Sequence, residues 1–218
     1  MQRAQPRNYS YDMLSRLTQA TTPESGTTHF CYTSSSSACV TPDTGTTLCS
    51  GDPNAVCRRT DARSITTTYS YDALSRLTGK TYSDSTPPAT FSYDQTSATI
   101  GSWSSTLTYP KGRLTKAVTT SGGNVQTAVV YSYDSMGRPT GYWQCTPYNC
   151  GSASIWSMPY SYGLAGDVTG WTHPAGSPTI TYTTLGAQRV TQITSDLNDS
   201  THTRSIWRRA SPILPGGR

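Results

Sequence analysis

The chain has 218 residues and a formal net charge of +5, and only 13% of its residues are charged, against roughly 25% in an average soluble protein. Ser and Thr together number 68, Tyr 15 and Trp 5, whereas Leu, Ile, Val and Phe together number only 28. This composition excludes a coiled coil and a Leu-rich helical core, and it favours a thin, turn-rich β structure packed through aromatic side chains.

The distribution of charge and apolar residues excludes several kinds of partner. Four arginines that make the chain basic lie together near its C-terminus, whereas a nucleic-acid-binding protein carries its basic residues along a face or a helix. No apolar run approaches the ~18 residues of a membrane-spanning helix, and none follows the early arginines as in a signal peptide. We therefore predict no nucleic-acid partner, no membrane insertion and no signal peptide.

One motif recurs along the chain and sets the expected architecture. Its strong copies begin at Tyr9, Tyr69 and Tyr131, and each reads Tyr-Ser-Tyr-Asp followed by a turn and an Arg. The weaker copies are anchored on a second aromatic at Tyr32, Tyr93, Tyr109, Tyr162 and Tyr182. The working period is about twenty residues with insertions, which is typical of stacked repeat units.

Each copy predicts a β-hairpin. The two tyrosines alternate with Ser, so both rings point to one face of a strand. The Asp that follows can bond its own backbone and start a turn, and Gly112, Gly137 or Gly166 supplies a positive φ just behind it. Ser15 and Ser75 occupy that position in the first two strong copies, where we expect a looser turn or another type. The predicted fold is an all-β, spiralling strip of antiparallel β-hairpins.

The six cysteines lie in two predicted inserts between repeats, at residues 29–57 and 143–151. Their spacing lacks the two-residue Cys pairs of most zinc sites, and His29 is the only nearby additional ligand. Disulfides, a zinc site and free thiols all remain open, because six cysteines allow fifteen pairings. A Pro and an Asn favour a turn between Cys145 and Cys150, so we predict a local disulfide there in an oxidising environment.

The strong copies resemble the Tyr-Asp (YD) repeats of the RHS family, which also occur in toxin-complex C components and teneurins. Residues 72–84 are similar to a typical bacterial RHS repeat with its following strand, and residues 61–69 to the usual lead-in. We expect repeats over 9–196, a lead-in at 1–8, and an atypical tail at 197–218 that is disordered or truncated. The residues that carry the repeat motif are Tyr9, Tyr11, Asp12, Arg16, Tyr69, Tyr71, Asp72, Arg76, Tyr131, Tyr133, Asp134, Gly137 and Arg138.

The resemblance implies a structural function. In bacterial members the strip closes into a hollow shell around a C-terminal toxin, and this chain is then a non-catalytic shell segment, open because it is incomplete. The implied partners are further shell repeats and a toxin domain, and the implied location is secreted or at the cell surface. The family's Asp-Pro-x-Gly autoprotease motif does not occur, since the only Asp-Pro is at Asp52 and is followed by Asn-Ala.

Cell-surface recognition is the alternative function, as in the cell-adhesion relatives. The tyrosine stripe would then stack against carbohydrate, although such stripes more often form a packed face of the strip. The Asp residues recur at one repeat position, and no position gathers His, Cys and carboxylate groups together. We therefore predict no enzyme activity and no catalytic, cofactor-binding or metal-ligating residue.

Overall fold

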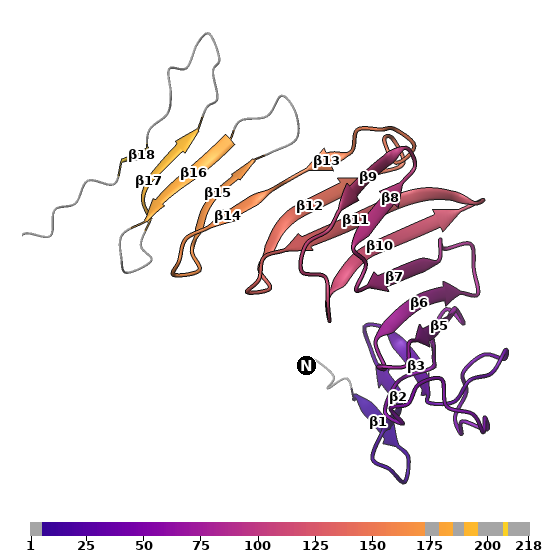
Figure 1. Ribbon diagram of the computed structural model, residues 1–218. Helices are drawn as coiled ribbons and strands as arrows, with labels where there is room; N and C mark the ends of the chain where they lie inside the picture. The colour runs from indigo at the N-terminus through magenta and orange to yellow at the C-terminus, as the bar shows by residue number, and fades with distance from the viewer. Residues whose placement is uncertain (1–5, 173–178, 185–189, 196–206, 209–218) are drawn as a thin grey trace, which may run out of the picture. The chain divides into compact units, whose positions relative to one another are not determined.

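The fold is built from antiparallel strands and turns (Figure 1). This computed structural model describes residues 6–172, 179–184, 190–195 and 207–208. Within these ranges there is no helix, and hence none with the length and apolarity to cross a membrane. The strands form open sheets, so the predicted all-β arrangement of antiparallel hairpins is confirmed. The predicted tail at 197–218 lies outside the described residues, apart from 207–208.

Two compact units divide the chain, and unit 1 comprises Met1–Ser92 and Ala117–Asn124. Its first seven strands follow one another in a single antiparallel ladder. They are β1 (Asn8–Tyr11), β2 (Leu17–Thr22), β3 (Gly26–Cys31), β4 (Arg58–Thr60), β5 (Thr66–Tyr71), β6 (Leu77–Tyr82) and β7 (Ala89–Tyr93). The second half of β10 (Leu114–Ser121) extends this ladder beside β7, where the Thr120 amide donates to the Pro88 carbonyl at 3.2 Å.

Unit 2 comprises Tyr93–Lys116 and Val125–Arg218. One of its ladders runs from β10 through β11 (Asn124–Tyr133) and β12 (Pro139–Cys145) to β13 (Trp156–Ser157). The other contains β14 (Tyr160–Tyr162), β15 (Val168–Thr172), β16 (Thr179–Thr184), β17 (Val190–Ser195) and β18 (Trp207–Arg208). A separate hairpin consists of β8 (Ser97–Ile100) and β9 (Trp103–Thr106).

The β8–β9 hairpin forms a second layer over the sheet of unit 2. Trp103 of β9 contacts Trp143 of β12, with ring centroids 5.5 Å apart, and Figure 1 draws the hairpin across β11 and β12. Ile100, Leu107 and Val130 are buried here. These aliphatic side chains come from both layers, so the hairpin gives the thin sheet a core that its own polar residues do not supply.

Every Tyr-Ser-Tyr strand pairs with its returning strand through the same irregularity. The register shifts between Ser10 and Tyr11, and likewise between Ser70 and Tyr71. The strands ending at Tyr133 and Tyr162 shift at the equivalent step. The unpaired residue is in each case a Thr near the start of the returning strand, so a recurring bulge adds one residue to that strand.

The turns at Ser15 and Ser75 are not looser than the glycine turns, so that expectation was wrong. Ser15 has a φ of 60° and Ser75 a φ of 58°, compared with 84° for Gly137. The Ser15 amide donates to the Asp12 carbonyl at 3.0 Å, the same distance as for Gly137 and its Asp. The Asp side chain bonds both sides of the turn, and this holds Ser in a left-handed conformation that costs roughly 1–2 kcal/mol.

Two predicted weak copies are a single interrupted repeat. The Asp94 amide donates to the Arg113 carbonyl at 3.2 Å, the bond that closes every intact turn, and Asp94 Oδ1 accepts the Gly112 amide. The β8–β9 hairpin is therefore inserted within the turn of the repeat that begins at Tyr93. Tyr109, which we predicted as a separate anchor, instead lies in the turn with a φ of 45° and 56% exposure.

Replacing Ser15 by Gly should stabilise the protein. The change removes an exposed side chain from a positive-φ position, and the gain is partly offset by the entropy of Gly, leaving up to about 1 kcal/mol. Thermal unfolding should then shift upward by up to about 2–4 °C. Ser15→Ala is the matched control, because it removes the hydroxyl but keeps the strained Cβ. An equal rise in both variants would contradict the account.

Candidate functional site

The recurring Asp closes its turn through both carboxylate oxygens. Asp12 Oδ1 accepts the amides of Leu14 and Arg16, each at 2.9 Å, and Oδ2 accepts Arg16 Nε at 2.7 Å. The turns at Asp72 and Asp134 repeat this arrangement within 0.1 Å. Since ionised oxygens accept these bonds best, the Arg16 amide and then its guanidinium hold the pKa of Asp12 below its ordinary value.

The Arg of three turns also contacts the second Tyr of the next repeat. The guanidinium carbon of Arg16 lies 4.3 Å from the centre of the Tyr32 ring, and the Tyr32 hydroxyl donates to the Leu17 carbonyl at 2.9 Å. Leu17 directly follows Arg16, so one Tyr contacts two consecutive residues of its neighbour. We call this arrangement the Arg–Tyr junction; it combines a cation–π contact with a hydrogen bond to the backbone.

The Arg–Tyr junction recurs twice in unit 2. Arg113 lies 5.5 Å from the Tyr133 ring centre, and Arg138 lies 4.7 Å from that of Tyr162. The Tyr133 hydroxyl donates to the Leu114 carbonyl at 2.6 Å, and the Tyr162 hydroxyl to the Pro139 carbonyl at 2.7 Å. In all three junctions the accepting carbonyl belongs to the residue after the Arg. Burial accordingly raises the pKa of Tyr32, Tyr133 and Tyr162.

Most of the predicted motif residues lie in turns and junctions, but not all of them are brought together. Tyr131 packs against Tyr133 and Tyr142, with ring centroids 6.4 and 5.4 Å away. The Tyr71 hydroxyl donates to the Val56 carbonyl at 2.7 Å, at the end of the cysteine insert. Tyr11 is 61% exposed, unlike every second Tyr that forms a junction.

One Asp turn was missed because its Arg is displaced. Asp61 Oδ1 accepts the amides of Arg63 and Ile65, and Ser64 has a φ of 63°. The guanidinium pairs with Asp61 from position 63 and not from position 65. Asp61 and Ser64 have the same spacing as Asp12 and Ser15, and this spacing was the sequence signal for an Asp turn. Residues 61–69 were instead interpreted only as a lead-in to the next repeat.

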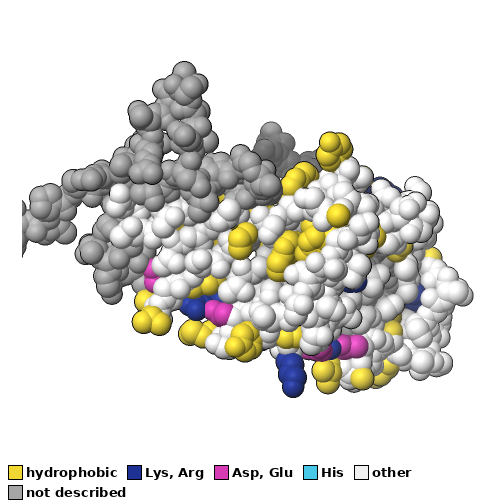
Figure 2. Space-filling model, turned by 45° about the horizontal axis from the view of Figure 1, so that its top comes forward, with side chains coloured by type: hydrophobic (Ala, Val, Ile, Leu, Met, Phe, Trp, Pro, Cys, Tyr) yellow, Lys and Arg dark blue, Asp and Glu magenta, His cyan; other side chains and the backbone are white. Residues whose placement is uncertain are grey.

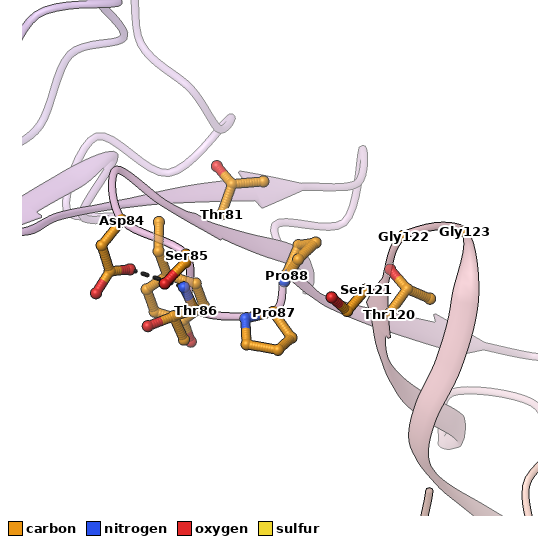
Figure 3. A pocket seen from close by; sticks show the side chains of 11 residues that line it. Thr81, Asp84, Ser85, Thr86, Pro87, Pro88, Thr120, Ser121, Gly122 and Gly123 are labelled. Carbon is orange, nitrogen blue, oxygen red and sulfur yellow. Dashed lines mark hydrogen bonds between the residues drawn. The ribbon is translucent and has the colours of Figure 1, made fainter.

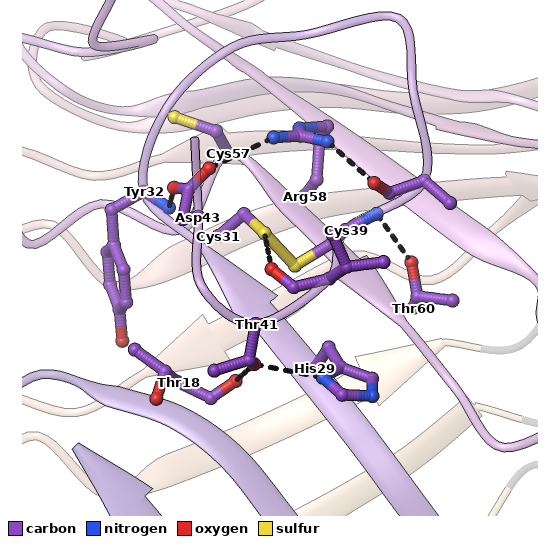
Figure 4. The surroundings of a disulfide bond; sticks show 12 residues. Thr18, His29, Cys31, Tyr32, Cys39, Thr41, Asp43, Cys57, Arg58 and Thr60 are labelled. Atoms are coloured by element: carbon purple, nitrogen blue, oxygen red, sulfur yellow. Dashed lines mark hydrogen bonds and ion pairs between the residues drawn. A yellow bond between two sulfur atoms is a disulfide. The ribbon is translucent and has the colours of Figure 1, made fainter. Parts of the chain in front are cut away.

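Two disulfides hold the first insert, and Figure 4 shows the one between Cys31 and Cys39. Cys31 is bonded to Cys39, and Cys49 to Cys57, and the sulfurs of Cys31, Cys39 and Cys57 belong to almost fully buried residues. The insert replaces the turn that would follow Tyr32, and β4 is its returning strand. Because all six cysteine sulfurs are paired in this structure, none is a thiolate available to zinc.

A buried ion pair lies beside these disulfides. Arg58 is 3% exposed, and its Nη2 lies 3.3 Å from Asp43 Oδ1. Its other nitrogens donate to the carbonyls of Thr33, Ser37 and Ala38. Although burial opposes it, hydrogen bonds from the Thr33 hydroxyl and nearby amides hold the pKa of Asp43 below its ordinary value. No sequence pattern pointed to Arg58, since its partners are backbone oxygens of an irregular loop.

The third disulfide joins Cys145 and Cys150, with Cα atoms 5.0 Å apart. Asn149 Oδ1 accepts the Thr146 amide at 2.9 Å and closes the intervening turn. The β8–β9 hairpin packs directly on this turn, because a Cβ on Gly101 would lie 2.4 Å from the Cys150 carbonyl oxygen.

Unit 1 also has a groove of about 400 Å³ between two turns (Figure 3). Hydroxyl-bearing side chains, Tyr82 among them, and the Asp84 carboxylate line one side, and the Gly122–Gly123 turn forms the other. Asp84 Oδ1 accepts the Thr86 amide at 3.0 Å, which orients the carboxylate. Such a lining can hydrogen-bond a polar, neutral ligand.

On the face shown in Figure 2, most of the described surface is backbone or uncharged polar side chains, with few charged groups. Its exposed apolar side chains include Met13, Leu14, Leu74, Met136 and Leu164, which all lie at the tips of Asp or Gly turns. Within the described ranges no three His, Cys, Asp or Glu residues are grouped so as to hold a metal ion.

Recurring Asp turns, bulges and Arg–Tyr junctions define the chain as a β-hairpin repeat protein. Residues 57–87 match the family model described as RHS Repeat. These residues therefore carry an RHS repeat, and the predicted resemblance to the RHS/YD-repeat family is confirmed there.

Comparison with other proteins gives distant similarities. No curated protein matches the chain. A porin-like protein from Bacteroides uniformis aligns at 14% identity and a TM-score of 0.41, over 95% of this chain and 89% of that one. The TcdB2-TccC3-Cdc42 and TcdB2-TccC3 structures align at 12% identity, with TM-scores of 0.27 and 0.26 over 88% and 93% of this chain. This chain spans only 13% and 14% of those chains, and none of these similarities is close enough to assign a fold or function.

Replacing Tyr133 by Phe should destabilise unit 2 by about 0.5–1.5 kcal/mol, because the Leu114 carbonyl loses its donor while the ring remains. Chemical unfolding monitored by tryptophan fluorescence would measure the loss. Tyr148→Phe is the matched control, since Tyr148 is 93% exposed. Equal stability of the Tyr133 variant and the wild type would show that the junction's hydrogen bond contributes nothing.

The protein should lose stability in acid. The amide and guanidinium of the returning Arg lower the pKa of Asp12 and Asp72, so their stabilising effect is full above about pH 4 and is lost as the pH falls through the lowered values. Unfolding midpoints should therefore change little from about pH 7 to 5 on account of these groups and decrease below pH 4. An Asp12→Asn/Asp72→Asn variant should be less stable at neutral pH and less sensitive to acid. An unchanged acid dependence would contradict this.

The cysteine pairing can be mapped by cleavage before Asp without reduction. Peptide 12–42 should carry an internal Cys31–Cys39 disulfide, and peptide 43–51 should be linked to 52–60 through Cys49 and Cys57. Mass spectrometry before and after reduction distinguishes these products. A link between 12–42 and either other peptide would refute the pairing. Removing the Cys31–Cys39 bond as a double Ala variant should cost about 2–3 kcal/mol.

Proposed function

We propose that the chain is a structural segment of an RHS-type β-shell, and that this shell encloses a C-terminal toxin. The Arg–Tyr junction is the observation that carries this proposal. In a wall built from successive hairpins, each repeat must be fixed by contacts that it makes only with the neighbouring repeat. The junctions at Tyr32, Tyr133 and Tyr162 meet that requirement with the same three groups.

The arrangement of the carboxylates supports a non-catalytic function. Asp12, Asp72 and Asp134 each use both oxygens to bond their own turn. A general acid or base needs a carboxyl group free to reach a substrate. The purified chain should therefore remain one species by intact-mass measurement during prolonged incubation. Fragmentation that stops when one acidic residue is replaced would contradict a non-catalytic function.

The proposed partners and location follow from the family match. Further shell repeats would extend the strip, a C-terminal toxin would be its cargo, and the assembly would be secreted or held at the cell surface. The test begins with the DNA that follows the codon for Asp199, translated in all frames. A shell core followed by a toxin region supports containment, whereas a membrane anchor or adhesive domains would overturn it.

Containment can then be measured on the longest product of that locus. A toxin region enclosed by the wall should resist a protease that degrades the same region when expressed alone. Equal digestion of the two would contradict encapsulation.

Carbohydrate recognition is the second candidate, and the groove of Figure 3 favours it. Tyr82 and the oriented Asp84 carboxylate line this groove among hydroxyl groups, a combination suited to sugar hydroxyls. Binding to immobilised glycans that is lost in Asp84→Ala would support it. Retention of binding in that variant would exclude this groove as the site.

A further inference from the structure

A cross-strand Ser–Gly pair recurs on the face of the strands that does not carry the tyrosines. Ser132 of β11 is the partner of Gly141 in β12, and Ser161 of β14 is the partner of Gly170 in β15. Each Ser alternates with Tyr along its strand, so both pairs lie on the face opposite to the tyrosine rings. Because glycine has no side chain, each pair leaves room above the backbone for another group to approach.

At Gly141 this room is filled by an indole ring. A Cβ on Gly141 would overlap Cη2 and Cζ3 of the Trp143 side chain. Trp143 lies two residues further along β12, so its side chain leaves the same face of the strand and folds back over the glycine. This repeat therefore shows which kind of group fits above a Ser–Gly pair in this protein.

At Gly170 no ring takes that place. The residue two positions further along β15 is Thr172, whose side chain is much shorter than that of Trp. Among the described atoms, a Cβ on Gly170 would approach only the Ile180 carbonyl oxygen, at an ordinary contact distance of 3.5 Å. A hollow of about 360 Å³ remains there, and its lining includes Ser161, Thr172 and Thr181.

We propose that the hollow over Gly170 is a binding site for an aromatic ring of indole size, either free or on a Trp side chain of another polypeptide. The glycine allows the ring to approach the backbone closely, and Pro159 supplies an apolar contact. Hydroxyl oxygens of Ser161 and Thr181 lie on either side of the glycine and can accept the ring N–H. The inference goes beyond the proposed function, because it requires neither a closed shell nor a cargo.

The lining favours a neutral guest in a preformed site. None of the residues that line the hollow is charged, so an ionic ligand would find no opposite charge there. The Trp171 indole nitrogen donates to the Tyr182 hydroxyl at 3.1 Å. This bond joins β15 to β16, the two strands that carry Gly170 and Thr181, and so holds the hollow open before the guest arrives.

Binding to the intact chain can be measured with 5-fluoroindole, whose single fluorine NMR signal changes when the ring is bound. We expect saturable binding with a Kd of about 1–10 mM, as for a ring of this size. Gly170→Val should weaken it by at least about tenfold, because the branched side chain occupies the hollow. Gly79→Val is the matched control, since Gly79 is likewise the partner of a Ser, Ser70, but does not line this hollow. Circular dichroism checks that each variant is folded.

Thr172→Trp gives a second readout that does not depend on an added ligand. The introduced ring should fold over Gly170 as Trp143 does over Gly141. It should therefore exclude 5-fluoroindole and raise the midpoint of thermal unfolding by about 2–4 °C. A variant that still binds the probe as the wild type does would contradict the proposed position of the ring.

A blocked Gly-Trp-Gly tripeptide distinguishes the two sources of the ring. Binding at least as tight as that of 5-fluoroindole supports a Trp side chain of a polypeptide, and weaker binding supports a free ring. Three results would overturn the proposal: no saturable binding, unchanged binding in Gly170→Val, or an equal loss in Gly79→Val. Displacement of the probe by glucose would also overturn it and would make a sugar the guest. Since no toxin or closed shell takes part, the outcome is independent of the containment test.

Discussion

The structure depends on one arginine that acts in two repeats at once. A single hairpin has too little apolar surface to be stable in water, so it must be fixed to its neighbours. The Nε of Arg16 bonds the Asp of its own turn, while the face of its guanidinium lies on the Tyr of the next repeat. Only a planar cation can use its edge and its face in this way, and an ammonium group has no equivalent geometry.

Long insertions occur within the turns of the repeats. They lie in the turns after Tyr32 and after Asp94, while the strands on either side keep their pairing. Each insert is stabilised by buried contacts of its own. The first has two disulfides around the Arg58–Asp43 pair, and the second packs Trp103 on Trp143. A chain with so few aliphatic residues thereby gains local cores without changing its repeat.

The sequence predicted the hairpin and its Asp turn because both arise from contacts within a few residues. Alternation in Tyr-Ser-Tyr and the backbone bonds of Asp are local properties. The Arg–Tyr junction was not predicted, since its partners are about 16–24 residues apart. Asp94 and Arg113 were assigned to two repeats for the same reason: the chain between them forms a hairpin of its own. The burial of Arg58 depends on carbonyl positions that only the folded insert defines.

The interrupted repeat shows that an Asp turn does not depend on the length of chain inside it. Asp94 reaches Arg113 across an entire hairpin with the same closing bond that Asp12 makes to Arg16. A segment inserted between the Asp and its returning strand is thus closed at its base by a hydrogen bond between residues that flank it. Such a turn is a natural insertion point, through which recombination can exchange surface segments while the scaffold on either side keeps its register.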